Sequence, residues 1–316
     1  MNGILLIPVV VSFFLSVIFC RLMLPLLRKL KFGQQIRQEG NPEHYKKQGT
    51  LTMGGIGYLA ALLVTCLIFV FRYPRMLPVL ILTMGFGIIG FIDDYLKVVK
   101  KQSEGFKIWQ KMLCQFILTA AFSVYCYKAL GTDVIIPFTG GKIWHMGWLY
   151  IPFVMFCVLG TDTGTNFTDG LDGLCSSVTV VVALFLMLIA GNENGGIACI
   201  SGAVAGVLMG FLFYNAHPAK VFMGDTGALA LGGFVAGAAI MLKIGWFIII
   251  FGIIYVIEVM SDIIQISYFH LTHGKRVFKM APIHHHFELS GYSETQIVAM
   301  FTCITVLACI VAYWAM

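Results

Sequence analysis

The feature that most constrains this chain is a series of ten apolar runs, most of them close to the length of a membrane span. A helix of about 20 apolar residues crosses the hydrocarbon core of a bilayer, whereas apolar runs of about 10–14 are typical of buried helices in soluble proteins. The runs therefore predict an all-α integral membrane protein with about ten transmembrane helices. They cover residues 4–27, 53–71, 76–96, 112–130, 147–166, 174–190, 196–215, 226–242, 245–269 and 293–316.

The composition also indicates that lipid is the main solvent. Hydrophobic residues make up 59% of the 316 positions and charged residues 11%, whereas soluble domains carry about 25% charged residues. No interruption between the runs is long enough for a separate soluble domain, so residues 1–316 are predicted to form a single polytopic membrane domain. The net charge of +6 does not indicate a nucleic-acid partner, because the basic residues lie in short loops where they set orientation.

The positions of Lys and Arg predict how the chain is oriented. When loop 28–52 is taken as cytoplasmic and the sides alternate, the inner loops hold fifteen basic residues and the outer loops four. This bias follows the positive-inside rule and places both termini on the outer side. On that side, two short extended stretches flank Gly140 and Gly141 and predict a small periplasmic hairpin near 133–145.

The first group of polar residues closes the third apolar run, at a predicted cytoplasmic helix end. Asp93 and Asp94 are adjacent, and Lys97 is spaced to pair with either one on a helix. Two carboxylates beside lipid are costly unless they are paired or bind a cation. The pattern is consistent with a salt-bridged helix end or with a site for Mg²⁺ and phosphate, because Mg²⁺ prefers carboxylate oxygens and substrate phosphates.

Two further groups of acids lie in the next inner loops. Asn166, Asp169 and Asp172 are spaced by three, so they would share one face if the segment is helical. Asp225 directly precedes the eighth apolar run, where it could cap the helix. The free N–H groups of the same helix end could instead attract phosphate. Nearby, Phe222 could anchor at the interface or stack on a base.

The last inner loop contains three consecutive imidazoles, His284, His285 and His286. Neighbouring side chains diverge, so the three are not expected to bind one metal ion, and a zinc site would show wider spacing. Imidazoles can contact a pyrophosphate and stabilise developing charge. In the ninth run, Glu258 and Asp262 predict a helix break that faces a wet groove, and the length of that run fits a kinked or tilted helix.

The polar clusters separate three function classes. A transporter would place ionisable groups near the bilayer midplane, whereas these carboxylates gather at one face. A structural scaffold has no need for so many acids at one interface. Carboxylates for Mg²⁺, lysines for phosphate and glycines for close approach are the parts that phosphoryl transfer requires. The clusters therefore favour a membrane enzyme that acts on a phosphorylated lipid.

These motifs resemble those of the phospho-N-acetylmuramoyl-pentapeptide transferases, a family of polyprenyl-phosphate N-acetylhexosamine-1-phosphate transferases. The resemblance covers nearly the whole chain, with the motifs in the family's order. The motifs are Lys47-x-Gly-Thr50-x-Thr52-Met-Gly-Gly, Asp93-Asp94-x-x-Lys97, Asn166-x-Thr-Asp169-Gly-Leu-Asp172-Gly, Tyr-Asn215-Ala-His-Pro-Ala-x-Val-Phe222-Met-Gly-Asp225 and Pro-Ile-His284-His-His-Phe-Glu.

The resemblance implies a reaction in which UDP-MurNAc-pentapeptide and undecaprenyl phosphate give lipid I and UMP, with Mg²⁺ as the cofactor. It also implies ten helices, a cytoplasmic active-site cleft in a bacterial plasma membrane, and a homodimer. A sister enzyme that transfers GlcNAc-1-phosphate to the same lipid is the alternative. The lipid phosphate would attack the sugar-linked phosphorus directly, and a two-step route through an aspartyl-phosphate at Asp225 or Asp93 stays open.

The resemblance also implies a role for each matching residue. Asp225 would bind Mg²⁺, with Asn166 as a second candidate ligand, and Asp93 would handle the proton or the attack of the lipid phosphate. The residues that would hold phosphates are Lys97, His284, His285 and His286. The rest of the polar cleft would comprise Asp94, Asn166, Asp169 and Asn215. The uridine pocket would comprise Lys47, Thr52, Asp172 and Phe222.

The sequence departs from the family's pattern at a few positions. Leu51 replaces the usual Pro, Asp162-Thr-Gly-Thr165 replaces Ser-Asn-Ala-Val, and Phe167 replaces Leu. Ala228 stands where Ser is usual. None of these changes removes a carboxylate or a lysine, but Asp162 adds a negative charge near the site.

Overall fold

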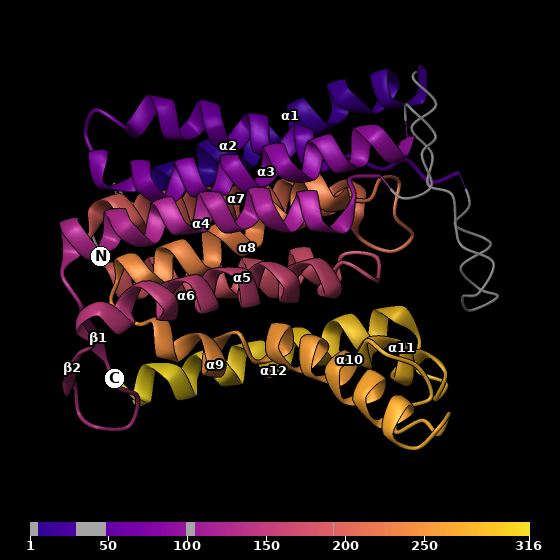
Figure 1. Ribbon diagram of the computed structural model, residues 1–316. Coiled ribbons are helices and arrows are strands. Elements are labelled where there is room, and N and C mark those ends of the chain that lie inside the picture. Colours follow the sequence, from indigo (N-terminus) through magenta and orange to yellow (C-terminus); the bar gives the residue numbers. More distant parts are fainter. Residues whose placement is uncertain (1–5, 30–48, 99–104, 192) are drawn as a thin grey trace.

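The computed structural model describes residues 6–29, 49–98, 105–191 and 193–316 as a bundle of helices that run between two ends of the molecule (Figure 1). In chain order the main helices are α1 (Ile7–Lys29), α2 (Gly55–Phe69), α3 (Leu77–Val98), α4 (Ile108–Leu130), α5 (Tyr150–Thr168), α6 (Leu174–Ala190), α7 (Gly195–Asn215), α8 (Gly224–Met241), α9 (Ile248–Phe251), α10 (Ile253–Leu271), α11 (Ile283–Glu288) and α12 (Glu294–Trp314). Short 3₁₀ turns precede three of them: η3 (Pro74–Met76), η4 (Gly147–Leu149) and η5 (Gly245–Phe247).

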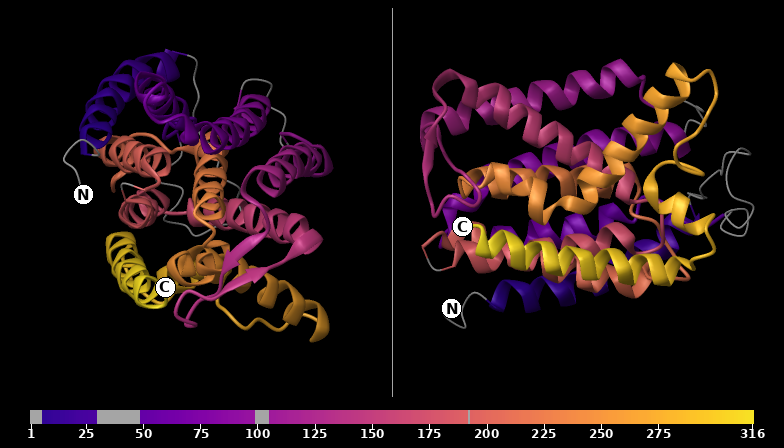
Figure 2. Two further views of the ribbon diagram at one scale, coloured as in Figure 1. Left: turned by 90° about the vertical axis from the view of Figure 1, so that its left-hand side faces the viewer. Right: turned by 90° about the horizontal axis from the view of Figure 1, so that it is seen from below.

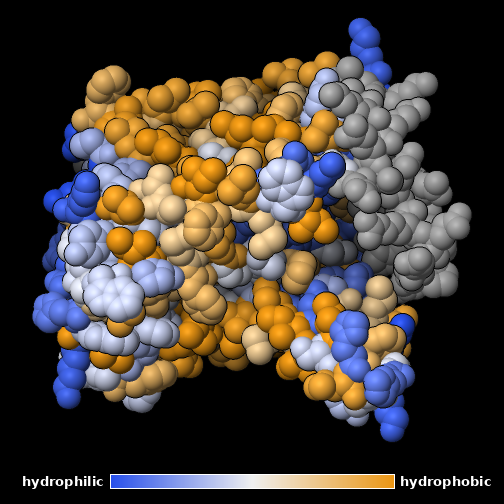
Figure 3. Space-filling view, in the orientation of Figure 1, coloured by the Kyte–Doolittle hydropathy of each residue, from blue (hydrophilic) through white to orange (hydrophobic). Residues whose placement is uncertain are grey.

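The helices confirm the predicted class, an all-α membrane protein. Within the described ranges, seven helical segments are long and apolar enough to cross a membrane: α1, η3 with α3, α4, α7, α8, α10 and α12. Two shorter apolar helices, α2 and α6, accompany them. Figure 3 shows hydrophobic residues over the middle of one face and hydrophilic residues gathered toward the ends, as expected for a protein whose middle faces lipid.

The two ends of the bundle carry different structures. The start of α1, the end of α12 and a two-stranded hairpin lie at one end, and α11 lies at the other (Figures 1 and 2). The hairpin confirms the strand pair predicted near 133–145. Strands β1 (Asp133–Ile135) and β2 (Ile143–His145) pair antiparallel, and Asp133 binds the side chains of His145 at 2.6 Å and Lys243 at 3.3 Å.

The ninth apolar run is interrupted, but not where the sequence predicted. The break falls at Gly252, between α9 and α10, rather than at the acidic pair one to two turns further on. Glu258 does not face a wet groove, because its side chain is fully buried and accepts a hydrogen bond from His284. The groove prediction was wrong because a buried partner from a distant loop satisfies this acid.

The positions of the polar clusters depend on how closely α3 packs against α8. Gly90 of α3 lies directly on the backbone of Asp225 and Thr226, at the first turn of α8, with no room for a Cβ. Gly233 of α8 lies against the ring of Phe86 one turn deeper. Small residues let the two backbones approach, and this approach places the cytoplasmic end of α3 beside the start of α8.

We expect Gly90→Ala to destabilise the protein, because its methyl group would overlap the backbone of α8. Overpacking of this kind costs about 1–3 kcal/mol, and the melting temperature in detergent should fall accordingly. The matched control is Gly160→Ala in α5, where an added Cβ meets nothing within 4 Å. That variant should stay within about 1 kcal/mol of the wild type. Equal melting temperatures for the two variants would contradict the close packing of α3 and α8.

Candidate active site

Two carboxylates and two ammonium groups form a network where α3, α4 and α8 meet. Lys97 lies 2.7 Å from Oδ2 of Asp93 and 3.1 Å from Oδ2 of Asp225. Lys111 bridges the same two oxygens at 3.4 Å and 2.7 Å. The predicted pairing of Lys97 with Asp93 is confirmed. Each lysine links two acids from different helices, so the network forms only when the helices are packed.

Further bonds orient the two acids of this network. The backbone N–H of Phe106 donates to Oδ1 of Asp93 at 2.8 Å. Asn166, in the last turn of α5, donates from Nδ2 to Oδ1 of Asp225 at 3.0 Å. Asp225 therefore lies within reach of α3, α4 and α5 at once, and both of its oxygens face polar groups.

Asp94 holds the start of α8 instead of joining the network. Its buried carboxylate accepts hydrogen bonds from the backbone N–H groups of Asp225 at 3.2 Å and Thr226 at 2.9 Å, and from Oγ1 of Thr226 at 2.6 Å. Asp225 is not the N-cap, because α8 begins at Gly224 and Met223 is at the cap position. These two N–H groups are already used, so they do not provide the free phosphate site that the sequence suggested.

Asp169 lies in the turn that follows α5. Burial raises the pKa of this carboxyl well above its usual range, and the negative charges of Asp225 and Asp94 raise it further. The helix ends at Thr168, so the prediction that Asn166, Asp169 and Asp172 share one helical face was wrong. The turn directs Asp172 to a different set of partners.

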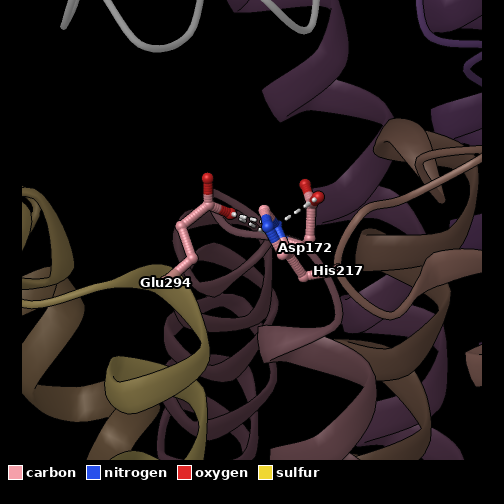
Figure 4. A group of neighbouring side chains, drawn as sticks. All are labelled: Asp172, His217 and Glu294. Atoms are coloured by element: carbon pink, nitrogen blue, oxygen red, sulfur yellow. Dashed lines mark hydrogen bonds and ion pairs between the residues drawn. The ribbon is translucent and has the colours of Figure 1, made fainter.

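Asp172 belongs to a second cluster, which Figure 4 shows. Its Oδ2 accepts a hydrogen bond from the backbone N–H of Ala219 at 2.9 Å and lies 3.2 Å from Nδ1 of His217. The same nitrogen lies 3.8 Å from Glu294, in the first turn of α12. One ligand atom from each of the three side chains lies within 4.8 Å of the others, but these atoms already bond to one another. The cluster joins the α5–α6 turn, the α7–α8 loop and α12.

The predicted uridine-pocket residues lie on paired segments. Leu51 forms an isolated parallel bridge with Val221, and the N–H of Phe222 donates to the carbonyl of Leu51 at 2.8 Å. A Cβ added at Gly224, whose φ is +70°, would contact Thr52 and Asp94, so Thr52 lies at the rim of the acidic site. Lys47 lies outside the described residues.

Asn215 is buried and fully bonded within the protein. Its Oδ1 accepts from Ser176 at 2.8 Å and its Nδ2 donates to the carbonyl of Val221 at 3.1 Å. In this structure the side chain holds the α7–α8 loop in place, so the contacts give it a structural role.

The three imidazoles of α11 have different surroundings. His284 is buried, and its Nδ1 lies 2.9 Å from Glu258. His285 pairs with Glu288 at 2.6 Å within the same short helix. His286 accepts the backbone N–H of Lys279. The structure does not place these rings in the lysine and carboxylate network among the contacts of the described residues.

Sequence reasoning missed Lys111, Glu258 and Glu294 as members of these clusters. Lys111 was counted only as a charge that sets orientation, although a lysine in the first turn of an apolar helix can face inward as well as outward. Asp162, the added acid, lies one turn before Asn166 on α5 and accepts from Gln115 at 2.7 Å. Its Oδ1 has no partner among the described residues.

The charges of the site favour a divalent cation. Asp93, Asp94 and Asp225 bring three carboxylates against the two ammonium groups of Lys97 and Lys111, and Asp169 adds a fourth acid. The donor atoms are carboxylate and amide oxygens, which suit Mg²⁺. The site could therefore hold Mg²⁺ and an anionic substrate together.

Comparisons with known proteins agree with this chemistry. The sequence model of glycosyl transferase family 4 matches residues 76–243, from η3 to just beyond α8. A phospho-N-acetylmuramoyl-pentapeptide-transferase of Clostridium perfringens (strain 13 / Type A) is 49% identical over 309 residues, which cover 96% of each chain. The proteins of the same name from Acetivibrio thermocellus and Clostridium botulinum (strain Alaska E43 / Type E3) are each 46% identical, over 97% and 100% of this chain and 94% and 98% of their own lengths.

We expect Asp169→Asn to stabilise the protein increasingly as the pH rises. Because the pKa of Asp169 is raised in the folded state, the folded protein keeps a proton that the unfolded chain loses from about pH 4 upward. The wild type should therefore lose stability relative to the variant between about pH 4 and the raised pKa. Melting temperatures of both proteins in detergent with EDTA would measure this, and a difference that is independent of pH would contradict it.

Asp133→Asn serves as the control of opposite sign. Hydrogen bonds from His145 and Lys243 lower the pKa of this exposed acid, so its charged form stabilises the fold above the unfolded-state pKa of about 4. This variant should lose stability relative to the wild type as the pH rises through that range.

Proposed function

The chain belongs to glycosyl transferase family 4 and to the phospho-N-acetylmuramoyl-pentapeptide transferases, and from this premise we propose the reaction that it catalyses. It transfers phospho-MurNAc-pentapeptide from UDP-MurNAc-pentapeptide to undecaprenyl phosphate, which forms lipid I and releases UMP. The enzyme thereby carries out a membrane step of bacterial peptidoglycan synthesis. A nucleotide-linked donor and a lipid acceptor both present phosphates, which is the chemistry that the site is suited to bind.

The observation that carries this proposal is the network of Asp93, Lys97, Lys111 and Asp225. Two ammonium groups held by two carboxylates, at one end of an apolar bundle, provide exchangeable partners for phosphate oxygens. An ammonium group can leave a carboxylate for a phosphate at little electrostatic cost, because one anion replaces another.

Mg²⁺ fits the site as a cofactor. Asp225 would hold the ion, with Asn166 as a second ligand once its amide turns the oxygen toward Asp225, since the two ends of an amide have nearly the same shape. When bound, Mg²⁺ would neutralise charge on the donor pyrophosphate and on the leaving group.

Side chains of this chain supply the remaining chemistry. Lys97 and Lys111 pair with phosphate oxygens of the donor, and Asp93 takes the proton of a protonated lipid phosphate or orients its attacking oxygen. That oxygen forms a bond to the sugar-linked phosphorus. The bond from this phosphorus to the UMP oxygen breaks, and its electron pair leaves with UMP.

The proposal places this reaction at the cytoplasmic face of the plasma membrane. The network lies at the end of the bundle opposite to the hairpin and the chain termini (Figure 1). In a topology of ten spans with both termini outside, this end also carries fifteen of the nineteen Lys and Arg residues assigned to loops and helix ends. The homodimer that the resemblance implies stays a prediction.

We expect the purified protein to release UMP when it is given undecaprenyl phosphate, UDP-MurNAc-pentapeptide and Mg²⁺. EDTA should abolish the release, and Asp225→Asn should lower kcat by about 100-fold or more, because it weakens the hold on charge in the transition state. Release from UDP-GlcNAc alone would identify the sister reaction instead. No release from either donor by folded protein would refute the proposal. A phospho-enzyme trapped without lipid would refute direct attack.

We expect Lys111→Gln to lower kcat/KM for UMP release by about 10²–10³-fold, since it removes one cation from the transferring phosphates. The matched control is Lys128→Gln, in the last turn at the other end of the same helix, where the side chain is exposed. Its activity should match that of the wild type. If both variants behave alike, Lys111 acts only through net charge.

A further inference from the structure

The fully buried pair of Glu258 and His284 has no part in the chemistry described so far. Oε2 of Glu258, within α10, lies 2.9 Å from Nδ1 of His284, within α11, and the two side chains are 0% and 1% exposed. An acid buried this completely in a membrane-spanning helix is costly unless a specific partner compensates it. Here the partner is a single imidazole that comes from a different loop.

The other side of the His284 ring faces the acidic site. A Cβ added at Gly170 would collide with Nε2 of His284, so this nitrogen lies directly on the turn that carries Asp169. Nε2 is buried and has no hydrogen-bond partner among the described residues. Glu258 therefore holds one ring nitrogen, and the ring directs the other at the turn beside the acidic site.

The other two imidazoles of α11 are held differently. Nδ1 of His286 accepts the backbone N–H of Lys279 at 3.1 Å, so that nitrogen cannot carry a proton while the bond lasts. His285 pairs with Glu288 three residues along the same helix at 2.6 Å and lies over His284 with ring centroids 4.1 Å apart. Of the three, His284 is the one that a distant, fully buried carboxylate orients.

We propose that Glu258 is a positioning residue that acts through His284. It keeps the proton on Nδ1 and aims Nε2 at the turn of Asp169 and Gly170, where Nε2 shares a hydrogen bond with a phosphate oxygen of the bound substrate. One proton lies in that bond, on the phosphate or on Nε2, and in both cases Nδ1–H stays on Glu258. This inference rests on the proposed transferase function and assigns the phosphate contact to one of the three imidazoles.

Glu258→Gln tests the proposal with little change in volume. The amide can offer an N–H to Nδ1, which would favour the tautomer with the proton on Nε2. Loss of a group that orients a functional imidazole costs about 10–100-fold, so kcat for UMP release should fall by that factor, with little change in KM. Glu258→Asp keeps the charge and should recover part of the loss. Asp262→Asn, one turn along α10, is the matched control and should retain wild-type kcat.

A second readout does not depend on activity. In ¹⁵N-histidine NMR spectra of the protein in nanodiscs, the signals absent from His284→Gln identify this ring. They should report the Nδ1–H tautomer in the wild type and lose it in Glu258→Gln. Gly170→Ala approaches the ring from the other side without touching Glu258. It should lower kcat in the wild type and have no further effect in a His284→Ala background.

The outcomes separate this inference from the proposed function. A folded Glu258→Gln that keeps wild-type kcat, or an unchanged His284 tautomer, would overturn the positioning role. A loss that appears only in KM would also overturn it. If Glu258→Gln does not fold, the tautomer in the wild type and the Gly170→Ala pair still decide the matter. Wild-type protein that releases no UMP would refute the function, while the tautomer measurement would stand.

Discussion

The close packing of α3 against α8 is the constraint on which the rest of the site depends. At Gly90 the backbone of α3 touches the backbone of Asp225 and Thr226, and no side chain separates them. The acids at the end of α3 therefore face the first turn of α8 across a distance that a single lysine can bridge. With the helices one side chain further apart, neither Lys97 nor Lys111 could contact both Asp93 and Asp225.

Charge within an apolar bundle requires compensation, and the site compensates its acids only in part. Salt bridges pair two of the carboxylates, and backbone N–H groups satisfy Asp94. Asp169 has a raised pKa because burial and like charges oppose its ionisation. The groups come from four separate segments, so tertiary packing, rather than any local motif, creates a site with an excess of negative charge that can accept a cation together with phosphates.

The sequence predicts the features that depend on length and spacing. Apolar runs of membrane length predicted the helices, the residues around Gly140 predicted the hairpin, and helical spacing predicted the pair of Asp93 and Lys97. It could not predict contacts that depend on which way a lone side chain turns. Lys111 looked like any loop charge, and Glu258 looked like an acid facing water, because their partners lie far away in the sequence. The end of α5 at Thr168 separated Asp172 from its neighbours, since Gly170 and Gly173 favour a turn over a continued helix.

Asp94 has a consequence for how this family of sites can be studied. Its carboxylate grips the backbone of α8 at two successive amides and so sets the direction in which Asp225 points. An alanine scan scored only by turnover would group Asp94 with Asp93 and Asp225, since all three losses would look alike. The first of these acids works as a mechanical fastener and the other two as chemical groups. Only a measurement of local order at the start of α8 would separate the fastener from the reagents.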